Sequence, residues 1–132
     1  METPRVRPSL EPYGTYPVHQ LLESASNKYP ERVAVIDGNN TYTYSELNVF
    51  ASKLASSLSN SGLSKGDRIA ILSPNCAEFV IAFYGIVRMG GIVTTINSGY
   101  REMEISHQIK NSGCKLVIAH HSLNETLEKS YS

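Results

Sequence analysis

The chain has 132 residues, which is enough for one domain with a hydrophobic core. Twelve basic and twelve acidic side chains cancel, so no excess of positive charge favours nucleic acid or an anionic membrane surface as a partner. Hydrophobic residues make up 41% of the chain, which excludes global disorder, and two cysteines, Cys76 and Cys114, are too few for a disulfide framework or a cysteine-rich metal site. We therefore expect free thiols and a cytoplasmic location.

The first 17 residues differ in composition from the rest of the chain. They contain four prolines and no apolar stretch typical of a signal peptide. We expect residues 1–17 to form an extended arm and residues 18–132 to form part of an α/β domain. The domain begins with a helix over residues 18–28, which places Leu21, Leu22 and Ala25 on one side.

A hairpin and a long helix follow. Residues 33–36 and 41–43 are rich in residue types that favour strands, and they flank a turn at 37–40. This pattern favours a β-hairpin. Thr43 and Glu46 have the spacing of a helix capping box, and Gly62 is suited to the end of that helix. Apolar residues recur between them at steps of three and four: Leu47, Phe50, Ala51, Leu54, Ala55 and Leu58. This periodicity predicts a helix that docks on a sheet.

The remaining residues alternate between strand and helix patterns. Strands are predicted at 68–72, 92–96 and 115–119, and helices at 76–89, 101–111 and 122–129. Asn75 and Glu78 have the spacing of a second capping box. The apolar segment 79–96 is broken by Gly90-Gly91, so we interpret it as a helix and a strand, with no membrane span. The pattern predicts an α/β fold with a layered, mostly parallel sheet flanked by helices and a short N-terminal β-hairpin.

One segment, "KGDRIAILSPN" at 65–75, combines glycine, a strand and a turn, as nucleotide-binding proteins often do. Phosphate-binding loops place their glycines after the strand, whereas Gly66 comes before it. Neither GxGxxG nor GxxxxGK[ST] occurs in the chain. Ser73 and Asn75 could donate to a phosphate, but capping of the following helix is the favoured interpretation.

A few other side chains are candidates for chemistry. His120 and His121 follow a predicted parallel strand, on the edge where α/β proteins bind ligands, but no cysteine or carboxylate accompanies them at metal-ligand spacing. His19 and His107 are expected on helix surfaces. Tyrosines that could stack on a ring are better explained by packing; these are Tyr42, Tyr44 and Tyr84. No GxSxG motif supports a serine nucleophile.

Several motifs in a fixed order resemble one family. "TYSEL" begins the long helix at Thr43, "GLSKGDRIAI" runs over 62–71, and "NCAEF" runs over 75–79. The segment "GGIVTTIN" at 90–97 and "EISHQIKNSGCKLVIA" at 104–119 follow. Together they resemble the N-terminal region of the AMP-forming acyl-CoA synthetase superfamily, which includes firefly luciferase, 4-coumarate-CoA ligases and nonribosomal adenylation domains. The family usually has proline where this chain has Ser98.

The resemblance implies a two-step ligase whose parent uses ATP, coenzyme A and Mg2+. A fatty or other small carboxylic acid attacks ATP to give an acyl-adenylate, and coenzyme A then displaces AMP. The family's Lys-ended phosphate loop, Tyr-Gly-x-Thr-Glu segment, Tyr-x-Thr-Gly-Asp segment and lid lysine do not occur in these 132 residues. We therefore carry over no catalytic, cofactor-binding or metal-binding residue. We expect an inactive N-terminal fragment of a fatty-acid-CoA ligase, with none of these cofactors bound to it.

Two other interpretations stay open. A stand-alone Rossmann-like or flavodoxin-like module would bind a nucleotide or flavin, although the glycine fingerprint is missing. An interaction element with an open sheet edge would self-associate.

Overall fold

The computed structural model describes residue 12 and residues 14–131. Most of the arm expected at 1–17 lies outside them, and residues 14–17 are exposed and belong to no helix or strand. The elements in chain order are α1 His19–Lys28, β1 Val33–Asp37, β2 Asn40–Thr43, α2 Tyr44–Asn60, β3 Arg68–Leu72, α3 Ala77–Met89, β4 Ile92–Ile96, α4 Glu102–Ser112, β5 Leu116–Ala119, the 3₁₀ turn η1 His121–Leu123 and α5 Asn124–Ser130. The predicted order of helices and strands is therefore confirmed.

The main sheet has the order β4-β3-β5, and both pairings are parallel. The central strand β3 is buried over 69–72 because helices cover both faces. Ile69 and Ile71 face one side, whereas Ala70 and Leu72 face the other, as the two-residue repeat of a strand requires. The predicted α/β fold with a parallel sheet and a separate antiparallel hairpin, β1-β2, is confirmed.

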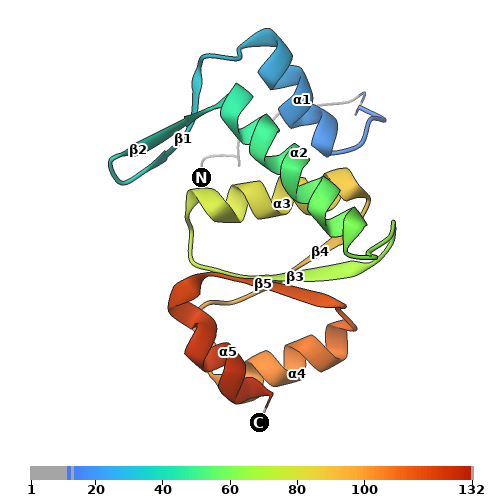
Figure 1. Ribbon diagram of the computed structural model, residues 1–132, viewed down its shortest axis with the longest axis vertical. Helices are drawn as coiled ribbons and strands as arrows, with labels where there is room; N and C mark the ends of the chain where they lie inside the picture. The colour runs from blue at the N-terminus through green and yellow to red at the C-terminus, as the bar shows by residue number, and fades with distance from the viewer. Residues whose placement is uncertain (1–11, 13, 132) are drawn as a thin grey trace, which may run out of the picture.

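Helices cover the two faces of the sheet in separate layers (Figure 1). The face of Ile69 and Ile71 packs against α3 and the end of α2, through residues that include Leu58 and Ile86. The opposite face packs against α4 and α5, and Ile105 is fully buried there. No helix within the described residues is long and apolar enough to cross a bilayer, and the segment 79–96 divides into α3 and β4 as predicted.

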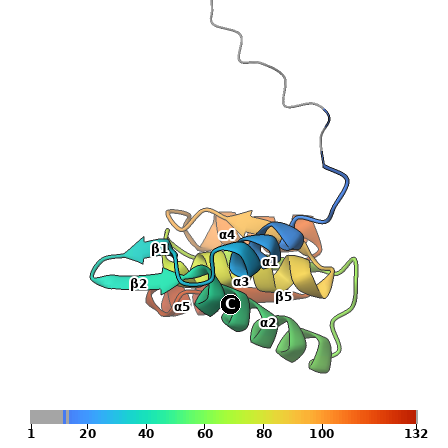
Figure 2. The ribbon, with the colours of Figure 1, turned by 90° about the horizontal axis from the view of Figure 1, so that it is seen from above.

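A third apolar cluster joins α1, the hairpin, α2 and α3 outside this sheet. It is centred on Leu22, Leu47 and Ala51. Figure 2 shows the hairpin projecting to one side of the helices that it packs against. The Arg88 guanidinium donates to the side-chain oxygen of Asn48 at 2.8 Å and lies 3.4 Å from the Glu23 carboxylate. One guanidinium therefore links α1, α2 and α3.

Two of the apolar side chains on the predicted helix faces lie outside the core. Leu21 is 48% exposed and Phe50 is 42% exposed. On α2 the contact face follows residues 47, 51, 55 and 58, so Phe50 lies at its rim. On α1 only Leu22 and Ser26 are buried, because this helix packs along one narrow line.

The ends of α2 follow the sequence closely. Glu46 donates its N–H to the Thr43 hydroxyl at 3.2 Å, and its carboxylate accepts the Thr43 N–H at 2.8 Å, so the capping box is confirmed. At the other end Gly62 has φ 90° and donates to Ser59, while Leu63 donates to Leu58. These two bonds form a Schellman motif, which requires the left-handed conformation that glycine adopts at low cost.

Candidate functional site

Three loops meet at the carboxyl edge of the parallel sheet. They are residues 73–75 after β3, 97–99 after β4 and 120–121 after β5. The loop after β3 leads to α3 on one face, whereas the loops after β4 and β5 lead to α4 and α5 on the other. Connections that leave in opposite directions open a crevice between neighbouring strands, which is where open α/β sheets bind ligands. Here β3 has such a crevice on each side.

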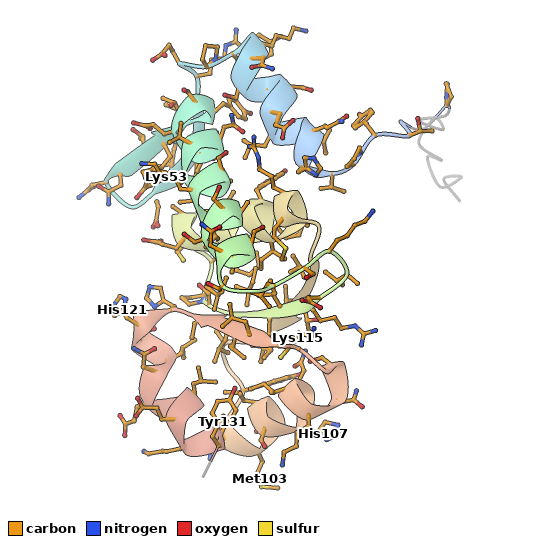
Figure 3. All side chains as sticks on the ribbon, turned by 45° about the vertical axis from the view of Figure 1, so that its right-hand side comes forward. Lys53, Met103, His107, Lys115, His121 and Tyr131 are labelled. Carbon is orange, nitrogen blue, oxygen red and sulfur yellow. The ribbon has the colours of Figure 1, made fainter. Side chains whose placement is uncertain are left out.

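The crevice between β3 and β5 is a pocket of about 270 Å³. Its wall includes apolar side chains from the sheet and from α3, among them Ile71 and Phe79, and a polar rim formed by Ser73, His120 and His121. Figure 3 shows His121 at this end of β5, with Lys115 at the opposite end of the same strand. The structure thus brings Ser73 together with both histidines, which lie almost fifty positions later in the sequence.

The crevice between β3 and β4 is wider, about 580 Å³, and more polar. Asn97 accepts the N–H of Gly99 through its side-chain oxygen at 2.8 Å, which fixes the loop as an Asx turn. Gln108 on α4 donates from its side chain to the carbonyl of Thr95 at 2.8 Å. Asn75 and Ser98 also line this crevice, so the two loops form opposite sides of one hollow.

The predicted Asn75–Glu78 capping box is wrong. The N-cap of α3 is Cys76, whose side chain makes no capping hydrogen bond. The Ser73 hydroxyl donates to the carbonyl of Pro74 at 2.9 Å and lies 3.3 Å from the Cys76 sulfur. The cap comes from the hairpin instead: the Asp37 carboxylate accepts the Ala77 N–H at 3.0 Å. A carboxylate therefore occupies the positive end of this helix, where a phosphate would bind, and this argues against a phosphate site at residues 73–75.

The rings of His120 and His121 are in contact, with centroids 4.2 Å apart and planes tilted by 36°. His120 Nδ1 lies 2.7 Å from the Ser122 hydroxyl and accepts the Ser122 N–H at 3.3 Å. Within the described residues no three histidine, cysteine or acidic side chains are placed to hold a metal ion. His19 is half-buried on α1, and His107 is exposed on α4, lining a separate open hollow with Tyr100 and Met103.

The tyrosines belong to the core, as the packing interpretation predicted. Tyr42, Tyr44 and Tyr84 all pack against the cluster of Leu22 and Leu47. Tyr84 also meets the ring of Phe83 edge to face, with centroids 5.3 Å apart. None of the three lines the two crevices at β3. Both cysteines are free thiols, as predicted.

The Gly66-Asp67 pair lies at the opposite edge of the sheet and has a structural role. Gly66 has φ 88° and donates to the carbonyl of Gly90 at 2.9 Å. The Asp67 carboxylate accepts the Ser64 N–H at 2.8 Å and lies 2.8 Å from the Lys115 ammonium. The hydrogen bond from Lys115, aided by the Ser64 amide, lowers the pKa of Asp67 from its ordinary value. The contacts of Gly66 and Asp67 therefore fix the entry to the central strand, at the edge of the sheet opposite the two crevices.

The fold, the motif order and this edge define the class of protein. The chain belongs to the AMP-binding enzyme family, whose model matches residues 22–131. It is 32% identical over 117 residues to a long-chain-fatty-acid–CoA ligase of Bacillus subtilis (strain 168), covering 89% of this chain and 21% of that protein. It is 34% identical over 113 residues to a 4-coumarate–CoA ligase of Pinus taeda, covering 84% of this chain and 21% of that protein.

A solved structure supports the same conclusion. The N-terminal domain of FACL13 from Mycobacterium tuberculosis superimposes with a TM-score of 0.81 at 29% identity, covering 85% of this chain and 29% of that chain. The fold is thus that of the N-terminal domain of acyl-CoA synthetases. The chain spans about a fifth of the length of the curated relatives it matches.

Proposed function

We propose that this chain supplies N-terminal scaffold to an AMP-forming fatty-acid–CoA ligase. Residues 18–132 form the first part of the N-terminal domain of that enzyme. The complete enzyme joins a fatty acid to ATP, releases pyrophosphate, and transfers the acyl group from AMP to coenzyme A, with Mg2+ supporting the first step. The match of residues 22–131 to the AMP-binding enzyme family, with a fatty-acid–CoA ligase among the relatives, is the observation that carries this proposal.

The described residues fit a scaffold better than a reaction centre. The helix end that could hold phosphate is capped by Asp37, and the glycine pair at 90–91 and the Gly66-Asp67 turn lie at the opposite edge of the sheet from the crevices. The sequence holds none of the family's phosphate, adenine, ribose or lid motifs. These observations favour a scaffold role for the chain, with the reacting groups supplied by other residues of the complete enzyme.

We expect the isolated 132-residue chain to be inactive. The test is release of pyrophosphate from ATP and Mg2+ with a long-chain fatty acid, and separately with 4-coumarate. The Bacillus subtilis ligase serves as the positive control. Pyrophosphate release by the isolated chain above the rate of a protein-free blank would overturn the scaffold assignment.

A chimera tests whether the chain can serve as part of the N-terminal domain of an active ligase. Residues 22–131 replace the matching segment of the Bacillus subtilis ligase, and we expect the chimera to retain fatty-acid adenylation. The matched control is the same chimera with Ile71→Asp, which places a charge in the fully buried centre of β3 and is expected to abolish activity. A chimera that is folded by circular dichroism but inactive would contradict the proposal.

Ligand binding tests one alternative function of the chain, nucleotide binding, and the mass in solution tests the other, self-association. The crevices on both sides of β3 are the observation that favours a nucleotide-binding module, and saturable calorimetric binding of ATP, NAD or FMN to the chain would support it. The exposed edges of β4 and β5 favour self-association, which sedimentation velocity measures directly. A monomer at high concentration would argue against it.

The cytoplasm is the compartment that we propose, on the basis of the two free thiols. Fractionation of cells that express the full protein tests this location.

A further inference from the structure

The β5–α5 connection is capped by the imidazole of His120. The backbone of His120 is extended and continues the ladder, donating to the carbonyl of Leu72 at 2.9 Å. Its ring then turns toward the 3₁₀ turn η1, where Nδ1 accepts the Ser122 N–H at 3.3 Å. The carbonyl of His120 accepts the N–H of Leu123 at 2.9 Å. His120 is therefore the N-cap of η1 through both its side chain and its backbone.

This hydrogen bond requires one protonation state of the ring. A backbone N–H can only donate, so Nδ1 must present its lone pair, and the neutral ring carries its proton on Nε2. The Ser122 hydroxyl, 2.7 Å from the same nitrogen, can donate or accept. Protonation of Nδ1 therefore leaves the hydroxyl contact intact but sets two donors, the ring N–H and the Ser122 amide, against each other.

In the part of the chain that the structure describes, no salt bridge to a carboxylate involves His120. Two titratable side chains share its pocket: His121, whose ring lies at a tilt with its centroid 4.2 Å away, and Glu78 on α3. A charge on His121 would repel a charge on His120, whereas Glu78 would attract one. Within the described residues neither ring forms an ion pair with Glu78, so the added proton gains no salt bridge in return for the lost amide bond.

We propose that His120 is a proton-sensitive cap that controls the shape of the β3–β5 crevice. When neutral, the ring holds the Ser122 amide and fixes η1. When protonated, it releases that amide, and η1 loosens. His120 and His121 form part of the rim of the 270 Å³ pocket, so a change in η1 moves that part of the rim. The proposal does not depend on the ligase assignment, because it follows from the contacts of residues 120–123 and from the pocket that the two histidines line.

The test uses nuclear magnetic resonance of the full chain, labelled with ¹⁵N, at pH 8 and pH 5, a range over which an imidazole changes charge. At pH 8 we expect the ring nitrogens of His120 to report the Nε2–H tautomer. On acidification we expect the Ser122 amide to lose about fivefold in protection from hydrogen exchange, after correction for the intrinsic rate, as for loss of a typical helix cap.

Two variants distinguish the loss of this cap from a general effect of low pH on the chain. His120→Asp supplies a carboxylate cap whose charge is constant between pH 5 and 8, so Ser122 should keep the same protection at both values. His121→Ala removes the neighbouring ring and should respond like the unmodified chain. In the unmodified chain, an Nδ1–H tautomer of His120 at pH 8, or equal protection of the Ser122 amide at both pH values, would overturn the proposal. Loss of Ser122 protection in His120→Asp at pH 5 would also overturn it. So would a His121→Ala variant in which Ser122 protection no longer changes with pH.

Discussion

Substitution of Gly85 by alanine tests the close approach of α2 and α3. Gly85 is buried on α3, and a Cβ built at this position would lie 2.6 Å from Leu54 Cδ2, 2.9 Å from Cγ and 3.0 Å from Cβ. Ordinary carbon–carbon contacts are about 3.5–4.0 Å, so the Leu54 side chain must move by roughly 1 Å. Leu54 is itself packed against the cluster of Leu58 and Ile86, which limits that movement.

Two effects of opposite sign decide the result. Alanine stabilises a helix interior by about 0.8–1.0 kcal/mol relative to glycine. Overpacking of a well-packed core costs about 1–3 kcal/mol. Because Cβ and Cγ of Leu54 are close as well as its terminal methyl group, we expect overpacking to dominate. Gly85→Ala should lower the free energy of unfolding by about 1 kcal/mol.

The assay is urea unfolding of four proteins: the unmodified chain, Gly85→Ala, Leu54→Ala and the double variant. Leu54→Ala alone should destabilise the chain through the cavity that it leaves. In that background the obstructing side chain is absent, so Gly85→Ala should become stabilising by about 1 kcal/mol. Equal effects of Gly85→Ala in the two backgrounds, or stabilisation in the unmodified chain, would refute the reasoning.

Three further predictions concern the cap, an ion pair and the core. Asp37→Ala should cost about 1 kcal/mol of unfolding free energy by exposing the first amides of α3, whereas Asp37→Asn, which keeps a side-chain acceptor, should cost less; equal losses would contradict this. The lowered pKa of Asp67 contributes stability that is fully present above its ordinary pKa of 3.8 and is lost as the pH falls through the folded value. The melting temperature of Asp67→Asn should therefore lie below that of the unmodified chain at pH 7, and the gap should narrow as the pH is lowered below 3.8; a gap independent of pH would exclude the pairing with Lys115. Ile105→Ala should cost about 2–5 kcal/mol in urea unfolding because Ile105 is fully buried. Met103→Ala, on the same helix but 85% exposed, should stay within about 0.5 kcal/mol, and similar losses for both would refute the burial assignment.

The candidate site could be predicted only in part. The sequence places residues 73–75, 97–99 and 120–121 after strands, and the rule for parallel sheets puts such loops on one edge. It does not reveal that Asp37 caps α3, because a carboxylate forty positions away leaves no periodic signal near the helix. Nor does it indicate that Ser122 bonds to the ring of His120, since that contact depends on the turn that η1 makes after β5.

The sequence by itself determined the elements of this protein and its family. Hydrophobic spacing marks each helix and strand, Thr43 and Glu46 mark the start of α2, and Gly62 marks its end. These signals are local, because hydrogen bonds within a helix and its caps join residues a few positions apart. The order of several such motifs was enough to identify the superfamily.

Only the tertiary structure decided which apolar residues are buried and which polar groups meet. Phe50 satisfies the helical repeat of α2 but lies at the rim, because the position of α3 and the sheet sets the width of the buried face. Asp67 and Lys115 immediately precede the neighbouring strands β3 and β5, and they meet because those strands pair in parallel. Such contacts depend on how elements pack, and packing is a property of the whole fold that no short stretch of sequence specifies.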